Sequence, residues 1–279
     1  MEEGPMDLPV IQYAKKICEQ ELRKALAAGK EGGIEIYYQP FVHVSTGKVI
    51  GAEALTRWVH PLLGDISPRI FVPLAESNGL VTDLDRYVLT VACQQARRWQ
   101  DTYGPIRIAT NISPHSLQHA DFVAVILNVL QETRLPPECL EIELTENIAI
   151  RQEHTLSILA RLKGLGIKIA IDDFGTGYSS LNYLRVFPVD TLKIDQVFVR
   201  DVENSQQEVP ITSAIIRLAH ELNLQIVAEG VESEEQKNYL LRKDCHVMQG
   251  FLFSKPLPAD QFERFLQASV QSGSRIGRC

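Results

Sequence analysis

Acidic side chains recur after short apolar runs, and this pattern is the strongest indication of chemistry in the sequence. Runs such as 169–171 and 226–228 have the character of buried β-strands. If these strands are parallel and share one sheet or barrel, their ends converge. Like charges at low dielectric repel strongly, so a converging group must take up protons or bind cations, and oxygen ligands suit Mg²⁺, Mn²⁺ or Ca²⁺. The six acids are Glu53, Glu143, Asp172, Asp173, Asp195 and Glu229.

Four oxygen ligands from four strands could hold one hard cation: Glu53, Asn111, Glu143 and Asp172. The adjacent Asp172 and Asp173 are more specific, because neighbouring strand residues face opposite sides and can share a site only where the strand ends and turns. One Asp could bridge two metals while the other binds the second, with Glu229 helping, and paired metals can clamp a phosphate. Taken alone, the Asp pair is equally typical of a β-turn.

Two basic residues accompany the acids. Lys193 lies two residues before Asp195, so both face the same side of their strand. A lysine inside a barrel is costly unless it has a partner, and among carboxylates it could hold an attacking water or a phosphate oxygen. Arg57 lies four residues past Glu53 and could fork a phosphate. The competing interpretations are a surface lysine and an ordinary salt bridge at the rim.

Composition limits the class of protein. The chain has 279 residues, 45% of them apolar, and a net charge of −7, which supports a buried core and argues against a broad DNA-binding surface. Its five cysteines are widely spaced, so we expect free thiols in a reducing compartment. The acidic N-terminus lacks an apolar signal core, and no run approaches the roughly 20 residues of a transmembrane helix. A cytoplasmic location is therefore expected.

Eight strand-like runs alternate, after the first two, with helical stretches. This alternation implies crossover connections and predicts an α/β fold, an irregular TIM-like (β/α)8 barrel. The first two runs are joined by a hairpin-length connection at 45–48, so the first strand should be antiparallel. The strand-like runs are 34–44, 50–57, 107–112, 139–145, 168–172, 191–195, 225–229 and 246–253, and the later helices are 83–100, 117–133, 152–164, 178–186, 208–222, 233–243 and 259–269.

One domain accounts for most of the chain. Helical spacing over 11–28 ends at glycines 29, 32 and 33. We expect an N-terminal helix or connector over 1–30, a barrel over 31–270 and a flexible C-terminal tail over 271–279.

At these residues the chain resembles the EAL domain family of cyclic di-GMP phosphodiesterases. The resemblance runs from about Leu22 to Phe265 and is specific, because many motifs appear in order. They are Tyr38-Gln-Pro40, Glu53-Ala-Leu55 with Arg57, Phe71-Val-Pro-Leu-Ala-Glu76, Asn111-Ile-Ser113, Glu143-Leu-Thr-Glu146, Asp172-Asp-Phe-Gly-Thr-Gly-Tyr-Ser-Ser180, Lys193-Ile-Asp195, Glu229-Gly-Val-Glu232 and Gln249-Gly-Phe251.

The resemblance implies metal-dependent hydrolysis of cyclic di-GMP to linear 5′-pGpG, which lowers the level of a bacterial second messenger. It assigns Glu53, Asn111, Glu143 and Asp172 to a first metal, and Asp172, Asp173 and Glu229 to a second. Lys193 would position or activate the water. Contacts to the dinucleotide would come from Gln39, Leu55 and Arg57, with support from Asp195, Glu232 and Gln249, and Glu146 would anchor the 174–180 loop.

The same resemblance implies two Mg²⁺ or Mn²⁺ ions, with Ca²⁺ bound but inhibitory. Such domains commonly form homodimers beside upstream sensory or cyclase domains. Two alternatives stay open: a catalytically silent receptor for cyclic di-GMP, and a different metal-dependent barrel enzyme that forms an enolate. A purely structural barrel would have little reason to gather six acids at one mouth.

Overall fold

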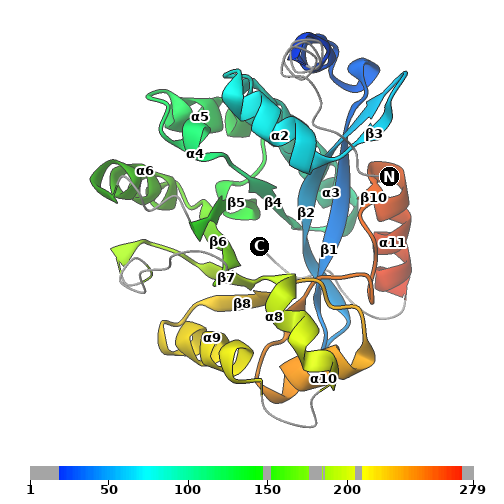
Figure 1. Ribbon diagram of the computed structural model, residues 1–279, viewed down its shortest axis with the longest axis vertical. Coiled ribbons are helices and arrows are strands. Elements are labelled where there is room, and N and C mark those ends of the chain that lie inside the picture. The colour runs from blue at the N-terminus through cyan, green and yellow to red at the C-terminus, as the bar shows by residue number, and fades with distance from the viewer. Residues whose placement is uncertain (1–18, 147–151, 176–183, 185, 205–208, 272–279) are drawn as a thin grey trace, which may run out of the picture.

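The strands close into an eight-stranded barrel, so the predicted TIM-like fold is confirmed. The computed structural model describes residues 19–146, 152–175, 184, 186–204 and 209–271. Around the barrel the strand order is β1-β9-β8-β7-β6-β5-β4-β2, and pairing of β1 with β2 closes the ring (Figure 1). The strands are β1 (Ile34–His43), β2 (Lys48–His60), β4 (Arg107–Asn111), β5 (Leu140–Thr145), β6 (Lys168–Phe174), β7 (Thr191–Ile194), β8 (Gln225–Ala228) and β9 (Val247–Met248).

The first strand runs against the others, as its hairpin-length connection predicts. β1 pairs in the antiparallel sense with β2 and β9, whereas the pairs from β2 through β4 to β9 are all parallel. Two further strands, β3 (Gly64–Ile66) and β10 (Leu257–Pro258), add antiparallel edges to β2 and β1. They were not predicted, because two or three residues are too few to show an apolar alternation.

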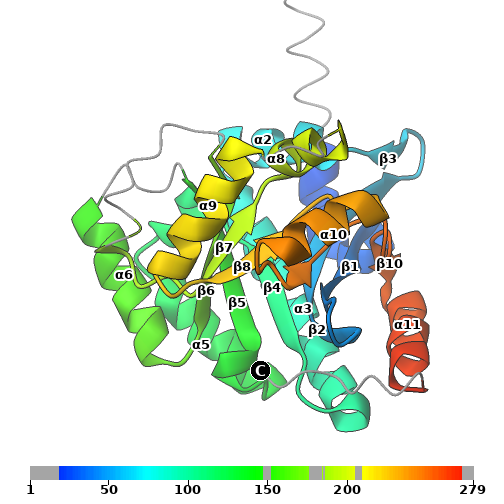
Figure 2. The same cartoon turned by 90° about the horizontal axis from the view of Figure 1, so that it is seen from below.

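Helices cover the outside of the barrel (Figure 2). The predicted helix over 117–133 is divided by a turn at 118–121. Helix α2 was not predicted because Pro73 interrupts its pattern. Helix α8 was missed because it has only 5 residues. The predicted helix 178–186 lies mostly outside the described residues. The helices are α2 (Pro68–Ser77), α3 (Val81–Tyr103), α4 (Pro114–Leu117), α5 (Phe122–Thr133), α6 (Gln152–Gly164), α8 (Gln196–Arg200), α9 (Pro210–Glu221), α10 (Glu234–Arg242) and α11 (Ala259–Gln271), with short 3-10 turns η1 (Gly29–Gly32), η2 (Pro137–Cys139) and η4 (Asp201–Asn204).

The barrel interior is layered along its axis. Near the N-terminal ends of the parallel strands, Arg107 Nε lies 3.3 Å from Glu141 Oε2, and Thr191 donates a 2.6 Å hydrogen bond to Glu141 Oε1. The next layer is apolar, and the larger apolar core lies between strands and helices. Inward-facing positions toward the C-terminal strand ends are thus left to polar side chains. The apolar layer is Phe41, Ala109, Val227 and Val247.

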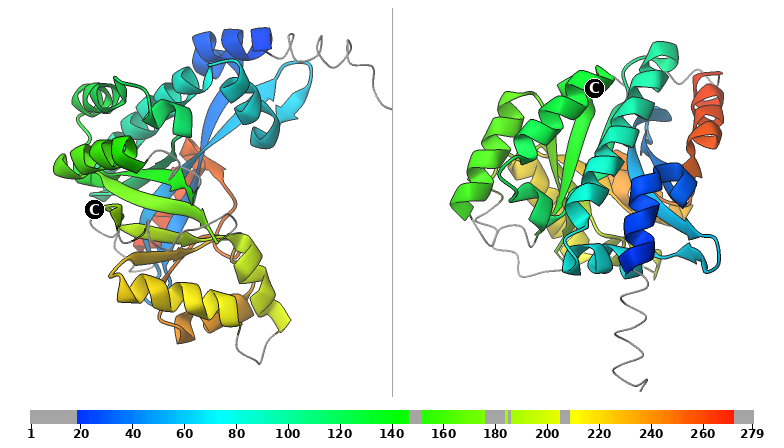
Figure 3. Two further views of the ribbon diagram at one scale, coloured as in Figure 1. Left: turned by 60° about the vertical axis from the view of Figure 1, so that its left-hand side comes forward. Right: turned by 90° about the horizontal axis from the view of Figure 1, so that it is seen from above.

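A helix over residues 19–28 lies on the outside of the barrel wall (Figure 3). Its Leu22 and Ala25 are buried. The chain leaves this helix through Gly29 and Gly33, which have φ of +59° and +83°, a region that glycine enters without steric cost. The division of the chain into 1–30, 31–270 and 271–279 stays a prediction, and residues 272–279 lie outside the described part.

The cysteines differ in state. Cys93 and Cys245 are buried free thiols, as expected. Cys139 is disulfide-bonded, so the expectation of a free thiol is wrong for this residue. Bridging depends on closeness in space, which spacing along the chain does not reveal. No helix in the described part of the chain has the length and apolar character needed to cross a membrane.

Candidate active site

Strand register brings the predicted acids to one level of the barrel. Asn111 ends β4 and lies beside Glu143 of β5, while Thr145 of β5 lies beside Asp172 of β6. Glu53 was expected at a strand end, but it lies in the middle of β2, opposite Gln39. β2 has 13 residues and continues beyond Ala54, its last residue paired with β4, to pair with β1 and β3.

Lys193 lies at the centre of the acids. It faces the barrel interior from β7 and is 1% exposed. Its Nζ lies 2.7 Å from Glu229 Oε1 and 2.8 Å from Glu143 Oε1. The distances to Asp172 Oδ1 and Glu53 Oε2 are 3.2 and 3.6 Å. One ammonium group therefore contacts four carboxylates from four strands or strand ends.

The carboxylates form two groups that share one residue. Ligand oxygens of Glu53, Glu143 and Asp172 lie within 4.8 Å of one another, and the same holds for Asp172, Asp173 and Glu229. A shared carboxylate between two oxygen-rich groups is the arrangement that a pair of divalent cations requires. These groups coincide with the two ligand sets predicted from the sequence, apart from Asn111, although their role as ligands stays a prediction.

Asp172 and Asp173 reach the same site by a local distortion of β6. The pairing of β6 with β7 shifts between Ile171 and Phe174, and Asp173 has a φ of +53°. The expectation that the strand must end there is wrong, because β6 continues to Phe174. A bulge re-aims a side chain without ending the strand. A left-handed φ is uncommon for a residue other than glycine and is typical of functional sites.

Charge in the cluster is unbalanced. Burial, then repulsion from Glu53, raises the pKa of Glu143, although Lys193 opposes this. Burial also raises the pKa of Glu229 against the same attraction. Burial, Asp172 and the nearby Asp195 raise the pKa of Asp173 to about 6.

The pKa values of Lys193 and Glu53 shift in opposite directions, because in both residues the interactions with neighbours outweigh burial. Burial disfavours the charged form of Lys193, but the surrounding carboxylates outweigh burial and raise its pKa. Burial opposes ionisation of Glu53 as well, yet Lys193 and the hydrogen bonds from Gln249 and Asn111 lower its pKa. A single lysine does not neutralise five carboxylates, so the donor set fits additional cations.

Two buried glutamines extend the site. Gln249 Nε2 donates 2.8 Å hydrogen bonds to Glu53 Oε2 and to Gln39 Oε1, and Gln39 Nε2 donates to the Ser254 carbonyl. Among the described residues, Gln249 Oε1 is buried without a hydrogen-bond partner. A buried amide oxygen without a donor is unusual and marks a position for a ligand or water.

Asn111 donates from Nδ2 to Glu53 Oε1 at 2.7 Å and to Glu143 Oε2 at 3.2 Å. A half-turn of its amide would present Oδ1 to the same space. Asn111 therefore has the reach to act as a neutral oxygen ligand.

A cavity of about 580 Å³ opens beside the acids. Leu55 and Arg57 line it together with Asn111 and residues of α2 and α3. The Arg57 guanidinium lies 5.8 Å from the centre of the Tyr37 ring and donates to the Thr56 carbonyl. The cavity is thus a largely apolar recess with two cationic side chains, Arg57 and Arg69, among its lining residues, next to the carboxylates.

Three predicted residues lie at the margin. Asp195 caps α8 by accepting from Val197 N at 2.7 Å, and it contributes to the raised pKa of Asp173. Glu232 is exposed and belongs to neither carboxylate group. Glu146 Oε2 accepts a 3.1 Å hydrogen bond from Gly175 N, at the start of the predicted anchored loop; residues 176–180 lie outside the described part.

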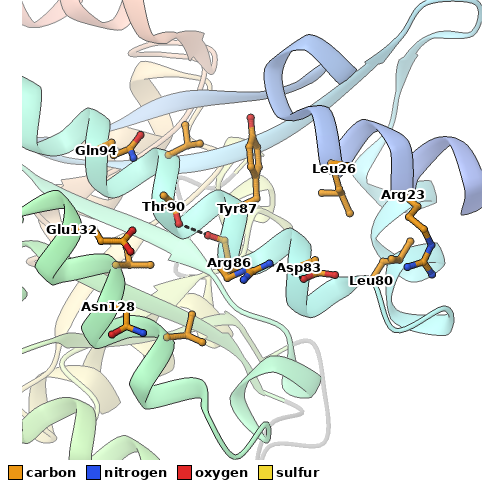
Figure 4. Close-up of a pocket in the computed structure, with 14 residues that line it drawn as sticks. Arg23, Leu26, Leu80, Asp83, Arg86, Tyr87, Thr90, Gln94, Asn128 and Glu132 are labelled. Carbon is orange, nitrogen blue, oxygen red and sulfur yellow. Dashed lines mark hydrogen bonds and ion pairs between the residues drawn. The ribbon is translucent and has the colours of Figure 1, made fainter.

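Sequence reasoning missed Asp85, a buried carboxylate on α3 that lines the same cavity. The signal was present, because Asp85 occupies a position between Leu84 and Val88 on the apolar side of a helix. A larger groove of about 780 Å³ lies outside the barrel between residues 19–28, α3 and α5 (Figure 4). This groove lacks Asn111 and the clustered acids, whereas Asn111 lines the cavity of about 580 Å³ beside the acids, so that cavity, called the mouth cavity below, is the better candidate.

The fold and this site together define an α/β barrel with an acid-lined C-terminal mouth, where barrel enzymes carry their active sites. Residues 19–256 match the family model for the EAL domain, and the chain belongs to the EAL domain family.

Relatives and solved structures agree with this membership. The chain is 42% identical over 249 residues to the signaling protein YkoW of Bacillus subtilis, covering 89% of this chain and 31% of YkoW. It is 41% identical over 252 residues to the cyclic di-GMP phosphodiesterase NbdA of Pseudomonas aeruginosa, covering 90% and 32%. The chain thus spans about a third of the length of the curated relatives it matches. The solved complex of PaMucR phosphodiesterase with c-di-GMP superposes with a TM-score of 0.82 at 43% identity, over 88% of this chain and 99% of that one.

Proposed function

We propose that this chain is a metal-dependent phosphodiesterase that hydrolyses cyclic di-GMP to linear 5′-pGpG. The observation that carries the proposal is the pair of carboxylate groups that share Asp172 around the buried Lys193, beside a cavity that could take a nucleotide. Family membership and the relatives named as cyclic di-GMP phosphodiesterases support the same substrate.

The donor set fits two divalent cations. Glu53, Asn111, Glu143 and Asp172 would hold the first, and Asp172, Asp173 and Glu229 the second. Bound Mg²⁺ or Mn²⁺ would supply Lewis-acid stabilisation of the phosphate and a lowered pKa for water. Ca²⁺ should bind and inhibit, because it holds ligands in a looser and larger geometry.

Lys193 would orient the attacking water. Its four carboxylate contacts keep the ammonium charged, as the raised pKa requires, so it acts as a hydrogen-bond donor rather than as a base. Gln249 fixes Glu53 from the side opposite Asn111. Both contacts limit the rotamers of Glu53 and pre-organise the first ligand set.

Substrate would enter across the mouth cavity. Leu55 offers an apolar surface, and Arg57 a guanidinium that can fork a phosphate. Gln39 would contact the dinucleotide, and Asp195 and Glu232 would contribute from the margin. Glu146 would hold the 174–180 loop through its bond to Gly175.

The surroundings of the domain belong to the same proposal. We infer a cytoplasmic domain that forms a homodimer and works with an upstream sensory or cyclase domain. The chain covers about a third of the length of each of these relatives, which supports the presence of further domains in proteins of this kind. Sedimentation of the purified chain at several concentrations tests the dimer, and a monomer at all of them would remove it.

The direct test is incubation with cyclic di-GMP and Mn²⁺, with separation of the products. We expect linear pGpG from the wild type and from Glu235→Gln, an exposed control on α10, and none from Glu53→Gln. Nucleotide binding without product would favour the silent receptor, and neither binding nor product would reopen the enolate-forming barrel enzymes. Full activity in excess EDTA would refute the role of the metals.

A further inference from the structure

Asp85 is a buried carboxylate whose main contacts are with a turn rather than with a cation. It lies in the first part of α3 and is 8% exposed. Within the described part of the chain no basic group pairs with Asp85. The neighbouring Arg86 pairs instead with the exposed Asp83, at 3.1 Å. A buried carboxylate is retained at such a cost only where hydrogen bonds compensate it.

The compensating bonds come from the turn that follows Asn111. Ser113 N donates a 2.9 Å hydrogen bond to Asp85 Oδ2. Burial raises the pKa of Asp85, and the hydrogen bond from Ser113 N opposes this effect. The Ser113 hydroxyl donates to Ser116 Oγ at 3.1 Å. Ser113 in turn caps α4 by accepting from Ser116 N at 3.1 Å.

The same turn is held on its other side by β5. Ile112 N donates to the Glu143 carbonyl at 3.0 Å. Asn111 is therefore followed by two backbone N–H groups, one bonded to the strand that carries Glu143 and one bonded to Asp85. The turn also forms a wall of the mouth cavity, to which Asn111, Ile112 and Ser113 all contribute.

Helix α3 is a firm support for this contact. Two residues after Asp85, the Tyr87 hydroxyl donates a 3.0 Å hydrogen bond to the Ile34 carbonyl of β1. Asp83, Arg86 and Tyr87 line the groove outside the barrel (Figure 4), whereas Asp85 lines the mouth cavity. One short stretch of α3 is thus tied to the barrel strand on one side and to the Asn111 turn on the other.

We propose that Asp85 is a positioning residue that holds Asn111 at the first cation site by fixing the turn at 112–113. This inference rests on the proposed function, because it concerns the same metal site. What Asp85 supplies is an acceptor for one backbone N–H, not a charge. An asparagine at 85 can replace it by accepting through Oδ1, and an alanine cannot.

The first test measures Mn²⁺ binding by calorimetry, without nucleotide. Partners of metal ligands typically change affinity by about 10- to 100-fold when removed. We expect Asp85→Ala to weaken Mn²⁺ binding by about that factor, and Asp85→Asn to stay within about threefold of the wild type. Asp83→Ala, which removes an exposed acid from the same helix, should bind as the wild type does. Circular dichroism establishes that each variant is folded.

A second pair of variants decides the matter if Asp85→Ala does not fold. Ser113 has a φ of −68°, which proline can adopt, so Ser113→Pro removes the N–H while Ser113→Ala keeps it. Mn²⁺ affinity at least about tenfold lower for the proline than for the alanine variant supports the role, and equal affinities overturn it. The inference is also overturned if folded Asp85→Ala binds as the wild type does, if Asp85→Asn is as weak as Asp85→Ala, or if the wild type binds no Mn²⁺. A wild type that binds Mn²⁺ but leaves cyclic di-GMP intact removes the proposed function and leaves this test standing.

Discussion

Replacing Lys193 by methionine should separate metal binding from turnover. The methionine keeps the length of the aliphatic chain but removes the only cation within 4 Å of Glu53, Glu143, Asp172 and Glu229 among the described residues. Breaking a buried ion pair by removing one partner costs about 3–5 kcal/mol. At about 2–4 °C for each kcal/mol in a domain of this size, the metal-free variant should melt roughly 6–20 °C lower at pH 7.

Divalent cations should reverse that loss. Lys193 Nζ lies among the same oxygens that would ligate metal, so its removal leaves Mn²⁺ affinity unchanged or higher. Binding to the folded state alone then restores stability. Turnover should nevertheless fall by about 10²- to 10³-fold, the usual cost of removing one pre-organised hydrogen-bond donor from the reacting centre.

Thermal melts with and without Mn²⁺, together with product formation at saturating Mn²⁺, measure both effects. Lys168→Met is the matched control, because Lys168 is a partly exposed lysine that shares Asp190 with Lys163. It should change neither melting nor turnover appreciably. Turnover by Lys193→Met within about threefold of the wild type would refute a role for Lys193 beyond charge balance.

Three further predictions concern the same site. The pKa values of Glu143, Glu229 and Asp173 lie above their unfolded values, so the stability linked to them is present at low pH and is lost as pH rises through their folded pKa values. Although Glu53 acts in the opposite sense, the free energy of unfolding of the metal-free protein should fall between about pH 5 and 7. Denaturant titrations should show that this free energy depends less steeply on pH when Mn²⁺ is present. Glu146→Ala should fold and melt within about 4 °C of the wild type, because its bond to Gly175 N is partly exposed and such a bond contributes roughly 1 kcal/mol or less. It should nevertheless lose most of its turnover, and wild-type turnover would remove the loop-anchor role. Ca²⁺ should raise the melting temperature while supporting little or no product formation, and turnover in Ca²⁺ equal to that in Mn²⁺ would contradict the proposed geometry of the ions.

The sequence predicted those parts of the site that depend on strand periodicity. Short apolar runs placed Glu143, Asp172 and Glu229 at or near the ends of parallel strands, and a barrel must bring such ends together. The spacing of Lys193 from the end of its run likewise fixed its inward direction. These inferences need only the alternation of side chains along a strand, which local sequence determines.

Features that depend on local distortion or on other elements could not be predicted in the same way. The bulge that turns Asp173 toward Asp172 is a product of tertiary pairing between β6 and β7. Asp195 follows an apolar run as the true cluster members do, but it precedes a helix and caps it. Asp85 lies on a helix, so a search for acids after strands passes over it.

The two charged layers of the barrel show why only one of them calls for added cations. In the lower layer Arg107 faces a single buried acid, Glu141, and Thr191 satisfies the same carboxylate, so this ion pair is balanced within the protein. In the upper layer one lysine faces at least four carboxylates at similar burial. A fold that can bury a matched pair has no structural need for an unmatched cluster, since each extra acid raises the free energy of the metal-free state. The excess negative charge is therefore best explained as the cost of a site that is completed by divalent cations.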